Sequence, residues 1–141
     1  MNEQLASALA AELAAIYAYG PIGVRLTATD ERAEARAAEA AHRNRRDMLV
    51  LRLAQLSVEP VAAPGGYALP FPVTARAAAL RLAVTVEDRV AAAWRATLPA
   101  TTGADRSTAL AALTDSAVRA TRWRRLAGVT PLTLPFPGRL P

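Results

Sequence analysis

The sequence predicts an all-α four-helix bundle made of two antiparallel helical hairpins, and three observations support this. Apolar residues recur at spacings of three and four over four long segments, which is the pattern of helices buried on one face. The connections between these segments run short, long, short, which favours two hairpins joined by one crossover. Alanine, a strong helix former that lets helices pack closely, accounts for 35 of the 141 residues.

The first two helices are predicted over about residues 3–26 and 30–56. The apolar stripe of the first helix consists of Leu5, Leu9, Ile16 and Tyr19, and Glu12 lies on the same stripe. The Gly20-Pro21 step predicts a kink or an irregular turn near the end of this helix. The second helix follows a short turn, and its inward line consists of Ala35, His42, Leu49, Leu53 and Leu56.

A proline-rich crossover is predicted over residues 57–73, since its four prolines rule out a continuous helix. The third helix, over about residues 74–98, has the most regular stripe: Ala77, Leu80, Val84, Glu87, Ala91, Trp94 and Leu98. The fourth helix, over about residues 104–127, is expected to bury Leu110, Leu113, Ala117 and Ala120 and to end at Gly128. Residues 128–141 form a second proline-rich segment, the tail.

The length of the crossover determines how the hairpins are joined. In an extended conformation it spans the ~40 Å length of such a helix, so the second and third helices are expected to run parallel. This is the ferritin-like arrangement, in a single domain over residues 1–141. The crossover and the tail share a repeat, Leu69-Pro-Phe-Pro72 and Leu134-Pro-Phe-Pro137. We interpret both as straps anchored by phenylalanine, whereas a proline-rich ligand for a partner's groove requires exposed phenylalanines.

Composition excludes several classes of function. The absence of cysteine excludes disulfides, thiol catalysis and iron–sulfur ligation. With a single histidine and no cysteine, the sequence does not favour the nucleophile–base triad of a hydrolase, and there is no glycine-rich phosphate loop. No run of eighteen apolar residues occurs, and the start of the chain lacks the basic and apolar regions of a secretion signal. We therefore expect a cytoplasmic protein that does not contact a membrane.

Four residues are candidates for a metal site in the bundle core: Glu12, Glu39, His42 and Glu87. Glu39 and His42 are three residues apart on one helix, and helical rise places all four at depths of about 15 to 21 Å in the bundle. Three carboxylates and an imidazole on inward stripes are costly to bury unless they are paired, protonated or bound to a cation. This ligand set suits iron or manganese.

These residues carry a resemblance. Glu12, Glu39-x-x-His42 and Glu87 resemble the ferroxidase-type half of ferritins, in which a tyrosine is often kept near the iron, as Tyr19 is placed here. Most of the chain is similar to an actinobacterial family of ferritin-like domains of unknown function. The segments that carry this similarity are Ala11-Glu12, Ile16-Tyr-Ala-Tyr-Gly20, Ala41-His42-Arg43-Asn-Arg45-Arg46-Asp47, Tyr67-Ala-Leu-Pro-Phe-Pro-Val73, Glu87-Asp88, Ala117-Val-Arg119 and Phe136-Pro-Gly138. The resemblance implies a fold and does not imply an activity.

The sequence also departs from that pattern. Leu13 stands where the family has a histidine, and Asp115-x-x-Val118 stands where di-iron proteins commonly bring a second Glu-x-x-His. Asp115 points away from the apolar stripe, so we do not count it as a ligand. The alternative to a metal site is a metal-free helical interaction or structural module, in which arginines such as Arg43, Arg45, Arg46 and Arg89 neutralise the core carboxylates.

The remaining features concern partners. After residue 104 the chain contains six arginines and two aspartates. Cations near a helix C-terminus are explained by its dipole, so we do not expect nucleic-acid binding. Trp94 and Trp123 are interpreted as packing or dimer-contact residues, and the alanine-rich faces predict a homodimer. The sequence leaves open whether the chain is an enzyme, and no catalytic residue is assigned.

Overall fold

The computed structural model describes residues 1–140, in which four long α-helices and one short 3₁₀-helix form a helical bundle without strands. The elements are α1 (Asn2–Arg25), α2 (Thr29–Gln55), α3 (Arg76–Thr97), η1 (Leu98–Ala100) and α4 (Gly103–Ala127). The four predicted helices are all present. The last residue of the predicted tail lies outside the described part of the chain.

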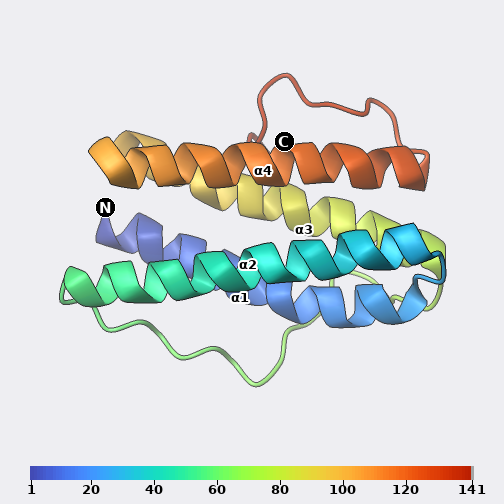
Figure 1. The fold of residues 1–141 in the computed structure, drawn as a ribbon, viewed down its shortest axis with the longest axis horizontal. Helices are drawn as coiled ribbons and strands as arrows, with labels where there is room; N and C mark the ends of the chain where they lie inside the picture. The colour runs from blue at the N-terminus through green and yellow to red at the C-terminus, as the bar shows by residue number, and fades with distance from the viewer. Residues whose placement is uncertain (141) are drawn as a thin grey trace.

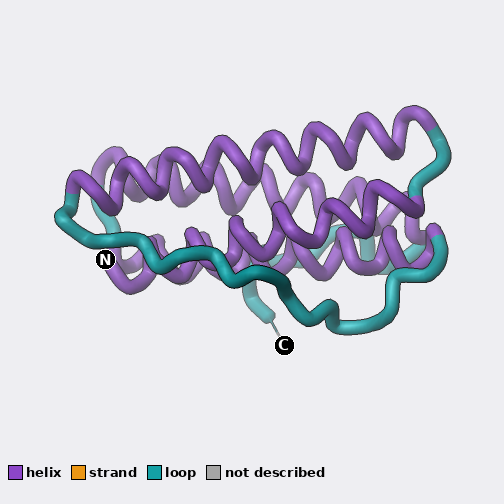
Figure 2. The backbone as a smooth tube through the Cα atoms, turned by 90° about the horizontal axis from the view of Figure 1, so that it is seen from below, coloured by secondary structure: helices purple, strands orange, loops and turns teal. Residues whose placement is uncertain are grey.

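The helices form two antiparallel pairs, and α2 and α3 run in the same direction (Figure 1). The connection between α2 and α3 has no regular secondary structure and follows the length of the bundle from one end to the other (Figure 2). It contains Pro60, Pro64, Pro70 and Pro72, which cannot donate a backbone hydrogen bond and so keep the segment out of a helix.

Helix α1 continues through Pro21 to Arg25, so the irregular turn expected at Gly20-Pro21 is absent. A proline in the last turn removes only one intrahelical hydrogen bond. Ile22 and Leu26, which are 0% and 2% exposed, anchor the segment that follows it in the core. Packing therefore outweighs the local cost of the proline.

Two helices end in the same way, with hydrogen bonds that turn the chain back on itself. The amide of Val58 donates to the Leu53 carbonyl at 2.9 Å, and the amide of Val129 donates to the Arg124 carbonyl at 3.0 Å. This Schellman geometry needs a left-handed residue. Gly128, with φ 68°, fills that position and ends α4 as predicted, whereas α2 uses Ser57 at φ 58°.

The core is built from alanines on facing helices together with a few large side chains. Ala8, Ala38, Ala79, Ala83, Ala109 and Ala120 are fully buried, and so are Trp94 and Trp123. The predicted inward face of α4 is wrong at Leu110, which is 54% exposed, and at Ala117, which is only partly buried, whereas Leu113 and Ala120 are buried as predicted. Its inward positions are instead filled by Ala109, Ala112, Leu113, Ser116, Arg119, Ala120 and Trp123. Small and polar residues occupy this face, so the apolar pattern alone placed it incorrectly.

The two repeated proline-rich segments behave differently. Leu69, Phe71 and Val73 of the crossover pack against the core, and the Arg81 guanidinium lies 5.7 Å from the centre of the Phe71 ring. The crossover is therefore a strap with a phenylalanine anchor. Phe136 in the tail is 59% exposed, so the expectation of a buried anchor is wrong for the tail.

Among the described residues, α1 alone is long and apolar enough to cross a membrane, with a mean hydropathy of 1.3 over its best window. Its apolar stretch is interrupted by Glu12 and so is not an uninterrupted apolar run of the kind sought in the sequence. Length and composition are weak evidence, because buried core helices pass the same test. In this bundle the apolar side of α1 packs against α2 and α3.

Candidate functional site

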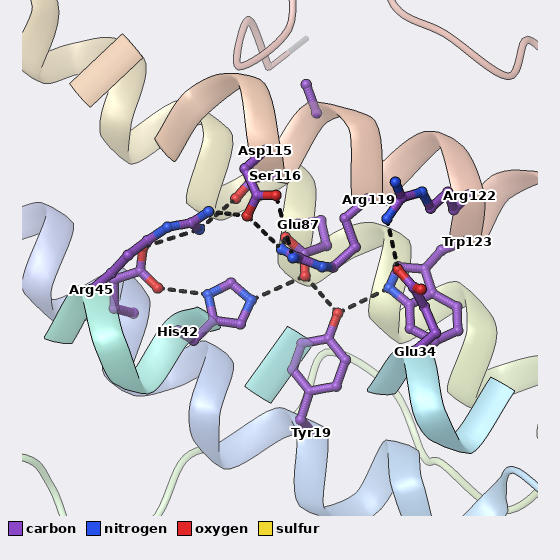
Figure 3. A network of polar contacts seen from close by, with 12 residues as sticks. Tyr19, Glu34, His42, Arg45, Glu87, Asp115, Ser116, Arg119, Arg122 and Trp123 are labelled. Atoms are coloured by element: carbon purple, nitrogen blue, oxygen red, sulfur yellow. Dashed lines mark hydrogen bonds and ion pairs between the residues drawn. The ribbon is translucent and has the colours of Figure 1, made fainter. Parts of the chain in front are cut away.

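A buried histidine bridges two buried carboxylates in the middle of the bundle. The Nδ1 atom of His42 lies 2.6 Å from Glu12 Oε2, and its Nε2 atom lies 3.0 Å from Glu87 Oε1. All three side chains are fully buried. Each comes from a different helix, α1, α2 or α3, because each occupies an inward position on its own helix. Figure 3 shows the contacts at both ring nitrogens, and a protonated imidazole donates a hydrogen bond at each of them.

Three aromatic side chains extend this hydrogen-bond network, and two of them donate to the carboxylates. The indole of Trp94 donates to Glu12 Oε1 at 2.6 Å, and the hydroxyl of Tyr19 donates to Glu87 Oε1 at 2.5 Å. The indole of Trp123 in turn donates to the Tyr19 hydroxyl at 3.0 Å. The phenol ring of Tyr19 also stacks on the imidazole of His42, with ring centres 5.6 Å apart.

Two arginines lie behind the carboxylates. Arg45 Nη1 is 3.7 Å from Glu12 Oε1, and Arg119 Nη1 is 3.7 Å from Glu87 Oε2. Asp115 bridges the pair, since it is bonded to Arg45 and accepts from Arg119 Nη1 at 3.0 Å. With His42 protonated, three carboxylates face three cations. We call these six side chains, together with Tyr19, Trp94 and Trp123, the core network, and the network carries no net charge.

The environment of His42 favours its charged form. Burial alone lowers the pKa of this imidazole, but the hydrogen bonds and negative charges of Glu12 and Glu87 more than offset it, so the pKa is raised from 6.5 to about 9. The pKa of the Tyr19 hydroxyl is raised well above its usual value, by burial first and then by the charge of Glu87. At neutral pH the site therefore contains an imidazolium and a neutral phenol.

Glu39 does not join the other three predicted ligands. Its carboxylate is 34% exposed and accepts a hydrogen bond from Arg43 one turn later at 2.7 Å. Three residues on a helix differ by about 60° in direction, so with His42 pointing at the core Glu39 lies at the edge of the helix. The expected inward position of Glu39 is wrong, while Glu12, His42, Glu87 and Tyr19 are brought together.

Several members of the core network were not predicted from the sequence. Of the arginines expected to neutralise the carboxylates, Arg43 pairs with the partly exposed Glu39 and Arg45 lies beside the buried Glu12. The cation beside Glu87 is Arg119 of α4, which was not predicted. Trp94 and Trp123 are indeed packed in the core, but each also donates a hydrogen bond. The sequence could have indicated this role, because the indole N–H of a buried tryptophan usually donates a hydrogen bond to a nearby acceptor.

As placed here, with His42 protonated, these residues leave no coordination position free for a metal ion. Both ring nitrogens of His42 are used by carboxylates on opposite edges of the ring, so no lone pair is free for a metal. Glu87 Oε2 is the one buried carboxylate oxygen here without a hydrogen bond, and it faces the cationic guanidinium of Arg119. Over residues 1–140, no group of three histidine, aspartate or glutamate side chains is placed to hold a metal.

Comparison with known proteins places this bundle in a class whose activity is unassigned. Residues 4–140 match the family described as "Domain of unknown function (DUF4439)", and the chain belongs to that family.

A solved structure supports the same grouping. The chain is similar to a conserved hypothetical protein, rv2844, from Mycobacterium tuberculosis, whose crystal structure aligns with a TM-score of 0.84 at 43% identity. The alignment covers 89% of this chain and 95% of that one. No curated protein matches.

Proposed function

We propose that this protein is a ferritin-like bundle that binds no metal in its core and acts as a structural or interaction module. The observation that carries the proposal is the placement of His42 between Glu12 and Glu87, with both ring nitrogens in hydrogen bonds to carboxylates. An imidazolium in this position supplies the positive charge that a metal supplies in a carboxylate-rich bundle. The parallel course of α2 and α3, joined by the long proline-rich crossover, supports the ferritin-like comparison.

The competing hypothesis is iron or manganese bound by the same residues. It is favoured by their chemistry, since two carboxylates, an imidazole and a nearby tyrosine are suitable groups for such a site. It requires His42 to lose a proton and to turn away from one of its two carboxylates.

Metal analysis combined with nuclear magnetic resonance distinguishes the two hypotheses. Protein purified without chelator is expected to contain no stoichiometric iron, manganese or zinc, before or after incubation with ferrous or manganous salt. The ¹⁵N spectrum at pH 7 is expected to show both ring nitrogens of His42 protonated. Stoichiometric metal in the wild type that is lost in Glu12→Gln but retained in Glu39→Gln would contradict the proposal.

We also propose that the module is a homodimer joined through the outer face of α2. This face carries an uncharged, exposed stripe at helical spacing: Ala33, Ala37, Ala40, Asn44, Met48 and Leu51. Small side chains let two such helices approach closely. Sedimentation equilibrium is expected to give a dimer, and Ala37→Glu is expected to give a monomer. A dimer of micromolar affinity is fully formed at a protein concentration of about 100 µM. A wild type that is still monomeric at that concentration would refute this part of the proposal.

A further inference from the structure

An apolar groove of about 490 Å³ lies on the side of the bundle away from the core network, between the outer faces of α3 and α4 and the tail. Its floor is formed mainly by Ala91 of α3 and by Leu110, Leu113, Ala117 and Val118 of α4. Its roof is formed by residues 133–138 of the tail, which arch over α4 (Figure 1). Leu110 and Val118 are 54% and 45% exposed, so the groove displays apolar surface.

The roof is held in a defined position on α3. Gly138 has φ 78°, and a Cβ atom on it would lie only 2.6 Å from the carbonyl oxygen of Ala91. The Arg95 side chain donates to the Pro137 carbonyl at 3.1 Å. A residue other than glycine at position 138 would therefore have to lift the tail, because neither the backbone angle nor the space allows a side chain.

One end of the groove is positively charged. Arg95 and Gly138 line both the groove and an open hollow that adjoins it, which Arg139 also lines. Over residues 1–140, neither Arg95 nor Arg139 forms an ion pair with a carboxylate, in contrast to Arg124, the other arginine of the groove, which pairs with Asp88.

We propose that this groove binds a long-chain carboxylate, with the hydrocarbon chain beneath the tail and the carboxylate at Arg95 and Arg139. Apolar lining favours a hydrocarbon chain, since each buried CH₂ contributes about 0.8 kcal/mol. Guanidinium groups match the planar, two-oxygen geometry of a carboxylate. The volume lies in the range of small-molecule sites, about 300–1,000 Å³.

A partner helix fits the groove less well. A helix with its side chains is about 10–12 Å wide, whereas the roof over residues 133–138 is held against α3 through Gly138 and Arg95. A single hydrocarbon chain needs no such width. The charge at one end also requires a ligand with one anionic group, which an apolar helix face does not supply.

The proposal is tested by isothermal titration calorimetry of the full chain with dodecanoate, and with dodecanol as the uncharged ligand of equal length. Dodecanoate is expected to bind at one site per chain. Arg95→Gln is expected to weaken it roughly tenfold, a loss of about 1.4 kcal/mol, and Arg95→Lys less. Arg46→Gln, which removes a surface arginine paired with Asp47 on α2, is the matched control and should leave binding unchanged.

Two further variants separate binding from folding. Gly138→Ala displaces the roof and Ala117→Leu fills the floor, so each should weaken dodecanoate binding while circular dichroism shows an intact bundle. The proposal is overturned if dodecanoate does not bind, if dodecanol binds equally well, or if none of the groove variants changes the affinity. The groove is separate from the core network, so these results are independent of the metal analysis.

Discussion

The position of His42 explains how two glutamates can be buried side by side with a histidine. A buried carboxylate without a partner costs several kcal/mol, and the interior of this layer holds two of them. The imidazolium satisfies one oxygen of each, at 2.6 and 3.0 Å. It is the one cation in hydrogen-bonding range of both, because Arg45 and Arg119 stay 3.7 Å away.

Replacing His42 should therefore be among the most destabilising single changes in the chain. We expect His42→Gln to lower the free energy of unfolding by about 3–5 kcal/mol, because a neutral amide leaves both carboxylates without their central charge. Urea unfolding followed by circular dichroism at pH 7 measures the loss.

The matched control is Glu39→Gln on the same helix. Glu39 is partly exposed and pairs only with Arg43, so its replacement should change stability by no more than about 0.5 kcal/mol. Equal losses in the two variants would mean that the core network does not depend on the imidazolium.

The residues of the site were predictable to different degrees. Glu12, His42 and Glu87 stood out because each interrupts an apolar stripe. Arg119 and Trp123 did not, because α4 has no strong stripe against which they can be recognised as inward. Glu39 was predicted to face inward because it is three residues before His42. Two residues at that spacing point in directions that differ by about 60°, so only one of them faces the core here.

At the scale of the elements, α2 and α4 are joined by ion pairs along their length. Towards one end of the bundle, Arg122 lies 3.3 Å from Glu34. In the middle, Arg45 pairs with Asp115. Towards the other end, Arg52 donates two hydrogen bonds to Asp105, of 2.9 and 2.7 Å. The first and last pairs are partly exposed and contribute little individually. They fix the register of two helices whose facing side chains are small or polar.

The end of α2 offers a stabilising substitution. Ser57 adopts φ 58° in the position where Gly128 stands at the end of α4, and a left-handed conformation costs a residue with a side chain about 1 kcal/mol. Ser57→Gly is therefore expected to stabilise the protein by about 0.5–1 kcal/mol, measured as an increase in the urea midpoint at unchanged slope.

The same substitution inside a helix should have the opposite sign. Ser107 lies in the first turns of α4 and is exposed, and its hydroxyl donates to the Gly103 carbonyl at 3.2 Å. Ser107→Gly should therefore cost about 0.5 kcal/mol, mainly through backbone entropy. Stabilisation by both variants would show that the effect does not come from the helix end.

The elements themselves were largely predictable, because loop lengths and helical spacing depend on local sequence. The four predicted helices are all present as α-helices within residues 1–140. The inward face of α4 could not be predicted in the same way. Ala109, Ala112 and Ser116 on this face are small and give a weak apolar pattern, whereas the large apolar Leu110 lines the outer groove. The irregular turn predicted at Gly20-Pro21 is absent, because the packing of Ile22 cannot be seen in a local pattern.

At the scale of the whole molecule, the core network connects all four long helices at one level. Glu12 and Tyr19 lie on α1, His42 and Arg45 on α2, Glu87 and Trp94 on α3, and Arg119 and Trp123 on α4. The charges balance only while His42 is protonated. The state of one proton therefore affects the packing of the entire bundle, and the cost of removing it should appear in global unfolding.

This gives a dependence of stability on pH whose sign can be worked out. The pKa of His42 is about 9 in the folded chain and 6.5 without partners, so the folded state binds the proton more tightly. The stabilisation is complete below pH 6.5 and is lost as the pH rises through 9, by about 3 kcal/mol in total. Urea unfolding at intervals between pH 6 and 9.5 should show this decline, and His42→Gln should show little of it.

The direction of this change also tests whether the core holds a metal. A metal-bound imidazole must be deprotonated, so a metal site gains affinity as the pH rises and stabilises the fold more strongly at high pH. A protein that is more stable at pH 9 than at pH 6.5, with the difference abolished by chelator, would exclude the imidazolium. A decline that chelator does not alter is expected, because the charge that holds Glu12 and Glu87 together is then a proton on His42.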